Sequence, residues 1–249
     1  MSFLALFRKE LRSYFTSPLF YVMAAVFFCL CGFFFYTWLI YFVEYGFGLN
    51  ILGNFWLAFL AGAPYSMSMV LLLVMPLLTM RLFAEEKKLG TIELLLTYPL
   101  RDRTILGAKY SACAAVLLVL LIGTLGYPAY LLALQPLPWA PLLSGYLGLL
   151  FLGLSFIACG LFISALTENQ VVAAIATLGI LLMFWALTWN EAASSPPVLR
   201  VLAQLSMFDH FETFVRGVID LRDVLYFVCF IAFFNFLTLR VLESRTWRG

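Results

Sequence analysis

The chain is dominated by long apolar stretches that alternate with short polar segments. Each stretch is near the length of roughly 20 residues that a helix needs to cross the hydrocarbon core of a membrane. We therefore predict one all-α polytopic membrane domain over residues 1–249, with no room for a large soluble domain. Six transmembrane helices are expected, at about 19–43, 55–80, 104–134, 142–166, 170–189 and 222–242.

Residues 1–17 predict a helix with two unlike faces. Apolar and aromatic side chains recur at helical spacing, at Phe3, Phe7, Leu11 and Tyr14. The opposite face carries three cations, Arg8, Lys9 and Arg12. A basic amphipathic helix of this kind lies in the interface between membrane lipid and water. It either serves only as the positive charge that keeps the N-terminus inside, or has a docking role as well.

Basic residues and turn signals together set the topology. No formal charge occurs from Tyr110 to Thr167, a length that holds two spans or at most three. The rigid turn Gln135–Pro141 favours two. With six spans, both termini lie on the side that carries most of the Lys and Arg, and we predict that this side is the cytoplasm. The basic residues left on the outer side are Arg200, Arg216 and Arg222.

The segment 190–221 is too long for a hairpin and too interrupted for a span. We predict two short extracytoplasmic helices, the first capped by Ser195 and the second opened by a capping box from Ser206 to Asp209. The second helix carries an apolar face with Phe208, Phe211 and Phe214.

Composition excludes several classes of function. Hydrophobic residues make up 64% and charged residues 11% of the chain, and the mean hydropathy is +1.02, which is typical of membrane proteins. The net charge of +2 is too small to argue for a nucleic-acid partner. The predicted spans have no Asp, Glu, Lys, Arg or His away from their ends, which argues against a proton-coupled carrier, a charged-ring channel and an intramembrane metalloprotease.

Cysteine and histidine give no metal or cofactor site. The cysteines are expected to be buried free thiols, at Cys29, Cys31, Cys113, Cys159 and Cys229. His210 is expected to be a solvated loop residue rather than a metal ligand. Small residues at helix-packing spacing predict close contacts, either within one subunit or between two copies, at Ser144 with Gly148, Ser155 with Cys159, and Gly160 with Ser164.

The charged island 81–103 interrupts the apolar pattern after the second span. It predicts a short helix at about 82–89 that ends at Gly90, since glycine readily adopts the left-handed conformation at a helix end. Thr91 can cap a second short helix with Glu93 in its first turn, and Pro99 ends it. Two rigid turns of helix beneath the membrane form a lever suited to passing a partner's motion to the second and third spans.

These residues resemble the permease subunits of type-2 ABC exporters. Members of that family carry an acidic-basic cluster, a Gly-Thr/Ser-x-Glu-x-Leu motif, a Pro and a later Lys in the same link, and this chain has Glu85-Glu86-Lys87, Gly90 to Leu95, Pro99 and Lys109. The resemblance covers the whole length, and it is closest to the gliding-motility-associated branch, in which a segment like Phe208 to Asp223 precedes the final span.

The resemblance implies that two permease subunits, identical or different, form a dimer on a dimer of cytoplasmic ABC ATPases. The implied ATPase contact comprises Arg81, Glu85, Glu86, Lys87, Gly90, Thr91, Glu93 and, as a shorter second contact, Thr167 and Glu168. The chain has no Gly-x-x-x-x-Gly-Lys-Ser/Thr phosphate loop, so ATP and Mg²⁺ would be bound by the ATPase and no cofactor by this chain. A periplasmic auxiliary subunit is a further candidate partner.

The leading hypothesis is therefore a non-enzymatic permease subunit of an ATP-driven exporter in a bacterial inner membrane. A copper-maturation permease of the nitrous-oxide-reductase type shares the expected architecture. A membrane anchor that works mechanically on an extracytoplasmic partner is an alternative from another class. An intramembrane enzyme has little support, because the spans lack catalytic groups.

Overall fold

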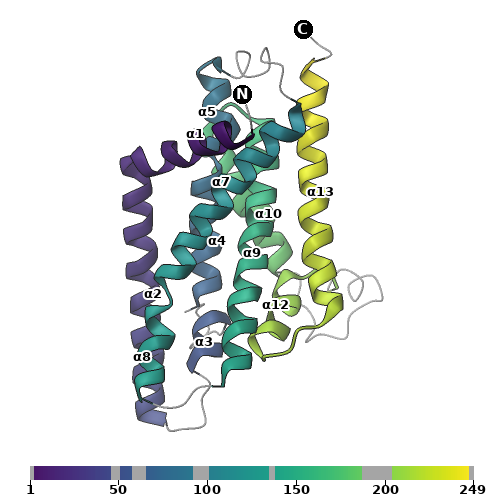
Figure 1. Ribbon diagram of the computed structural model, residues 1–249. Helices are drawn as coiled ribbons and strands as arrows, with labels where there is room; N and C mark the ends of the chain where they lie inside the picture. Colours follow the sequence, from purple (N-terminus) through teal and green to yellow (C-terminus); the bar gives the residue numbers. More distant parts are fainter. Residues whose placement is uncertain are drawn as a thin grey trace.

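The computed structural model describes residues 3–45, 51–57, 66–91, 101–134, 138–186 and 204–246. All regular structure in these ranges is helical, as predicted. The helices, labelled in Figure 1, are α1 (Phe3–Thr16), α2 (Pro18–Tyr45), α3 (Ile51–Leu57), α4 (Met67–Thr79), α5 (Arg81–Lys88), α7 (Asp102–Gly123), α8 (Gly126–Leu134), α9 (Trp139–Leu166), α10 (Gln170–Ala186), α12 (Met207–Val215) and α13 (Leu221–Thr246).

Within the described residues, five stretches of helix are long and apolar enough to cross a membrane. They are Pro18–Glu44, Met67–Lys88, Asp102–Leu134, Trp139–Leu166 and Leu221–Ser244. The fifth predicted span, at about 170–189, corresponds to α10, which is apolar but has 17 residues in its described part. The structure therefore confirms several long apolar spans, whereas the count of six stays a prediction.

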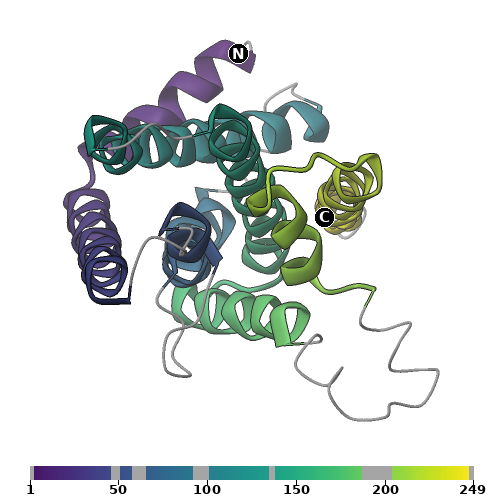
Figure 2. The ribbon, with the colours of Figure 1, turned by 90° about the horizontal axis from the view of Figure 1, so that it is seen from below.

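The long helices run side by side as one bundle, and Figure 2 views this bundle end-on. Helix α9 is at its core and packs against α4, α7, α10, α12 and α13. Both termini lie at the same end of the bundle as α5, with α1 lying across that end, while α3 and α12 lie at the other end (Figure 1). Which end faces the cytoplasm stays a prediction.

Small residues on α9 allow its neighbours to approach closely. A Cβ atom on Gly160 would lie 2.6 Å from the Cβ of Thr79, and one on Gly148 would lie 2.6 Å from the Cβ of Phe214. The hydroxyl of Ser144 donates to the carbonyl of Phe214 at 2.8 Å. Two of the predicted small-residue pairs therefore make their close contacts within the subunit.

The third predicted span, at about 104–134, was expected to be one helix. It consists of two, α7 and α8, which are separated at Thr124 and Leu125. Pro128 has no N–H to donate to the carbonyl of Thr124, its usual helical partner. That carbonyl accepts the backbone N–H of Tyr127 at 3.1 Å and the hydroxyl of Tyr146, also at 3.1 Å. A hydrogen bond from α9 thus stabilises a break that apolarity alone could not reveal.

Some predictions fall outside the described residues. They concern the second half of the charged island with Glu93 and Pro99, the helix expected after Ser195, and part of the turn before Pro138. The second short helix predicted in 190–221 is present as α12, and Ser206 precedes it as predicted, although its side chain forms no capping bond.

Candidate coupling site

Helix α5 is held at its first turn by a serine from α9. The backbone N–H groups of Phe83 and Ala84 both donate to Ser164 Oγ at 3.0 Å, and this hydroxyl donates to the carbonyl of Met80 at 3.1 Å. All three contacts are buried or part-buried. Ser164 of α9 thereby supplies hydrogen-bond partners to backbone N–H and C=O groups at the junction of α4 and α5. A capping side chain does the same at the end of its own helix.

The far end of α5 is held by a lysine. Lys87 is buried, and its Nζ donates to the carbonyl of Ala165, the next residue of α9 after Ser164. Past this point, α5 ends and Gly90 has a φ of 68°, the left-handed conformation that its position predicted. Both ends of α5 are thus fixed to the last turn of α9.

A cluster of four charges joins α5 to α1 and α7. Lys109 Nζ on α7 lies 2.9 Å from Glu86 Oε1 on α5 and 3.2 Å from Glu10 Oε1 on α1. Lys9 Nζ lies 3.5 Å from each of the two carboxylates. The exposed fractions of the side chains are 1% for Lys109, 9% for Glu10 and 15% for Glu86, but 57% for Lys9. The strong pairs are therefore those of Lys109.

A buried ammonium group is tolerated only where other groups replace its water. Besides the two carboxylates, the ring of Phe83 lies against Lys109, with its centroid 5.2 Å from Nζ. Removing one partner of such a cluster costs about 3–5 kcal/mol, because the remaining charges stay buried without compensation. The cluster therefore fixes the distance between three helices.

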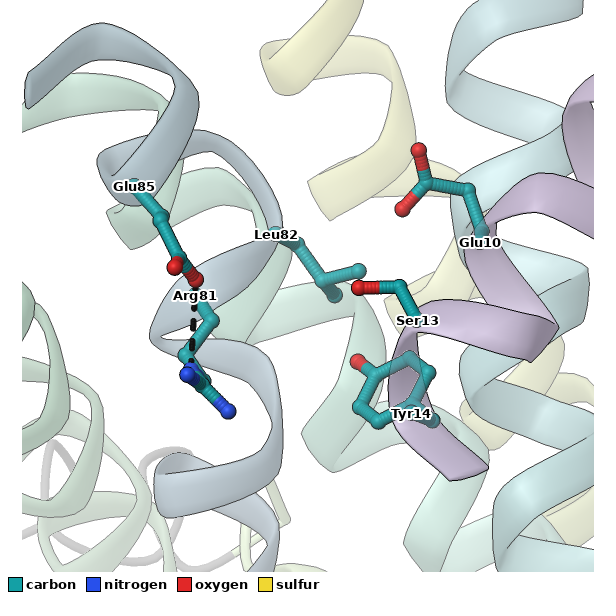
Figure 3. A pocket seen from close by; sticks show the side chains of 6 residues that line it. All are labelled: Glu10, Ser13, Tyr14, Arg81, Leu82 and Glu85. Atoms are coloured by element: carbon teal, nitrogen blue, oxygen red, sulfur yellow. Dashed lines mark ion pairs between the residues drawn. The ribbon is translucent and has the colours of Figure 1, made fainter. Parts of the chain in front are cut away.

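Figure 3 shows the pocket between α1 and α5. It is lined by Glu10, Ser13, Tyr14, Arg81, Leu82 and Glu85. Arg81 forms an ion pair with Glu85 at 3.2 Å, and its Nη1 donates to Ser17 Oγ at 2.8 Å. Because Ser17 is the residue between α1 and α2, α5 is tied to the corner at which the chain turns into its first long helix.

Tyr14 makes a second connection from α1. Its hydroxyl donates to the carbonyl of Leu78 on α4 at 3.0 Å. Burial raises the pKa of Tyr14 well above its usual value, so the hydroxyl keeps its proton and stays a donor. Helix α1 is therefore bound to the second long helix as well as to α5.

The structure separates the residues of the predicted partner contact into two groups. Glu86 and Lys87 point into the subunit and bind α7, α1 and α9, as described above. The exposed group contains Gly90, Thr91 and Glu168, and Lys88, which the prediction did not include, is exposed beside them. Thr167 is partly exposed, Arg81 and Glu85 line the pocket of Figure 3, and Glu93 lies outside the described residues. Whether the exposed residues bind a partner stays a prediction.

Sequence reasoning did not single out Glu10. Leu6, Glu10 and Tyr14 follow one another at intervals of four residues, and all three are buried. A carboxylate at this helical spacing, on the face otherwise occupied by apolar residues, was the signal that could have found it. Arg8 and Arg12, on the opposite face, are exposed as expected.

At the other end of the bundle, the prediction for His210 is wrong. His210 is buried rather than solvated, with Nδ1 2.6 Å from Asp223 Oδ1 and Nε2 3.0 Å from the carbonyl of Gln204. Its ring stacks on Tyr226 at 4.0 Å between centroids. Because Asp223 belongs to α13, the histidine attaches α12 to the last long helix, a contact that local sequence does not indicate.

The apolar face of α12 and the cysteines can also be compared with their predictions. Phe211 and Phe214 of α12 are buried and Phe208 is partly buried, in agreement with the predicted apolar face. All five cysteines are free, but Cys29 and Cys229 are exposed rather than buried. Both lie on long apolar helices with one outward face, so an exposed thiol there meets the same apolar surroundings as its neighbours.

Comparison with known proteins supplies the family. No curated protein matches the chain. The model of the ABC-2 family transporter protein matches residues 4–242, nearly the whole chain. The chain is therefore a multi-pass membrane protein of the ABC-2 transporter family, a permease subunit of an ABC transporter.

Proposed function

We propose that this permease couples ATP hydrolysis by a separate ABC ATPase to export across a bacterial inner membrane, with α5 and the link after it as the point of contact. The supporting observation is that α5 is fixed at both ends to α9 while its tip, Lys88 to Thr91, is exposed. A force on the tip is then transmitted to the core helix rather than absorbed by a flexible loop.

The proposed assembly holds two permease subunits on an ATPase dimer, and ATP with Mg²⁺ binds the ATPase. Glu168, in the exposed turn after α9, provides a second contact beside α5, because α9 ends at the residues that hold α5. Within the family, the gliding-motility-associated branch is the proposed position of this chain, on the basis of its segment from Phe208 to Asp223.

Charge reversal at the proposed contact tests it. Lys88→Glu, Glu93→Lys and Glu168→Lys are expected to weaken copurification of the ATPase about tenfold or more, and to lower its stimulated ATP hydrolysis, because a reversed charge repels the partner's groups. Arg240→Glu, an exposed reversal on α13, is the matched control and leaves both values unchanged. Unchanged copurification and hydrolysis in all three variants would refute the contact.

A mechanical coupler that acts on an extracytoplasmic partner is the second candidate function. One observation favours it: α12 is bound to α9 by Ser144 and to α13 by the pair of His210 and Asp223, so it forms a rigid platform. Flux measurements on vesicles containing the complex distinguish the two. ATP hydrolysis without movement of lipid, glycan or peptide supports the coupler, and ATP-dependent flux supports the exporter.

A further inference from the structure

The charge cluster of Lys109, Glu10 and Glu86 connects three helices, which stability alone does not require. Its three strongly paired members come from three different helices, α7, α1 and α5. One of these, α5, is the proposed contact with the ATPase. Another, α1, lies across the end of the bundle and leads directly into α2 (Figure 1).

We propose that these residues form a clasp that makes the interfacial helix α1 move together with α5 during the ATPase cycle. Lys109, Glu10 and Glu86 are then positioning residues, which carry motion from the contact to the first long helix. This inference rests on the proposed function, because the motion originates in the ATPase.

The geometry allows little relative movement between these helices. The pairs measure 2.9 and 3.2 Å, and a displacement of α5 by a few ångströms would leave Glu86 buried without its cation. Within the described residues, Glu86 Oε2 is already buried without a hydrogen-bond partner, and the other cation at Oε1, Lys9 at 3.5 Å, is exposed, so only a weak contact holds the carboxylate when Lys109 is lost. Movement of α5 alone is therefore less favourable than movement of α5 with α1.

Two further contacts lie on the same path. Arg81 donates to Ser17 at the corner between α1 and α2, and Tyr14 donates to the carbonyl of Leu78 on α4. These bonds place the second attachment of α1 at its C-terminal end, whereas Glu10 attaches its middle. A helix attached at two points follows the rotation of its neighbour as well as its translation.

Distances between spin labels test the clasp. One label is placed on α1 at Arg12→Cys and the other at Trp139→Cys, the exposed first residue of α9 at the opposite end of the bundle. The exposed Cys29 and Cys229 are replaced by alanine, and the buried cysteines are retained. The permease is measured by pulsed EPR in lipid nanodiscs, both alone and in complex with the ATPase.

In the complex with otherwise native residues, trapping the ATPase with ADP and vanadate is expected to shift the distance between the labels by about 2 Å or more, the scale of helix shifts in switching proteins. Lys109→Met removes the cation at similar volume, and Glu10→Gln removes one charge while keeping a hydrogen-bond acceptor. Both variants are expected to lose the shift although the ATPase stays bound. An unchanged shift in both variants, or no shift in the parent complex, overturns the clasp.

The permease alone gives an independent result. Lys109→Met is expected to broaden the distance distribution, because α1 loses its middle attachment, whereas Arg240→Met, which removes an exposed cation on α13, leaves it narrow. A narrow distribution in Lys109→Met contradicts the clasp even if no ATPase binds. Failure of the ATPase to bind the native permease would instead count against the proposed function, so the two failures are distinguishable.

Discussion

The hydroxyl of Ser164 is the group whose loss should most affect α5, and Ser164→Ala removes it with little change in volume. Two buried backbone N–H groups lose an acceptor and the carbonyl of Met80 loses a donor. An unsatisfied buried group costs roughly 1–3 kcal/mol, and partial rearrangement at the junction lowers the sum. We expect a decrease of about 2–4 kcal/mol in the free energy of unfolding.

Ser155→Ala is the matched control for this substitution. Ser155 lies on the same helix and is equally buried, but its hydroxyl donates only to the carbonyl of Phe151, within α9, at 2.9 Å. Because that carbonyl also accepts a helical bond, its loss should cost about 1 kcal/mol or less. The difference between the two serines therefore isolates the connection between helices.

Unfolding of the purified permease by SDS in mixed micelles measures the free energy, and hydrogen exchange locates the change. A cost of about 2 kcal/mol corresponds to exchange that is roughly 30-fold faster at the amides of Phe83 and Ala84. Amides in the middle of α9 should keep their rates. Equal destabilisation by Ser164→Ala and Ser155→Ala, with unchanged exchange in α5, would refute the assigned role.

Two further substitutions test the packing of the bundle. His210→Ala should destabilise the permease by about 3 kcal/mol or more, because the carboxylate of Asp223 stays buried without its partner, whereas Glu212→Ala breaks an exposed ion pair and should cost less than about 1 kcal/mol. Gly160→Ala should cost about 1–3 kcal/mol, since the added methyl group meets α4, whereas Gly179→Ala meets nothing and should be neutral. Thermal unfolding in detergent measures all four, and a larger effect in either control would contradict the packing described.

Much of the fold follows from apolar periodicity and charge. The long runs predict helices that span a membrane, and the cations near the ends predict which helix ends lie together. Apolarity does not indicate the break between α7 and α8, where Pro128 cannot donate to the carbonyl of Thr124, and the hydroxyl that donates to it belongs to Tyr146, 22 residues further along the chain. Propensity describes a residue and its neighbours in sequence, whereas this bond depends on helix packing.

The charged island predicts a short helix that ends at Gly90, and the structure has this helix as α5, but the sequence does not indicate which way its side chains point. The resemblance to type-2 exporter permeases implies that Glu86 and Lys87 belong to the partner contact, and a charged run in a membrane protein suggests solvated side chains. Both are used within the chain, since their partners, Lys109 and the carbonyl of Ala165, come from distant parts of the sequence. Local sequence likewise does not indicate the contact of His210 with Asp223, which is why the prediction that His210 is solvated is wrong.

The orientation of α5 explains why a short segment can carry both kinds of role. Phe83, Glu86 and Lys87 are spaced by three and four residues, so they share the face turned toward α7 and α9. Lys88 follows directly and is exposed, as are the residues after it up to Thr91. One face of the helix therefore fixes its position in the subunit, and its exposed end is available for the proposed contact with the ATPase. Transmission of force requires both features, because a helix that binds a partner without being fixed to its own subunit would move without moving the rest of that subunit.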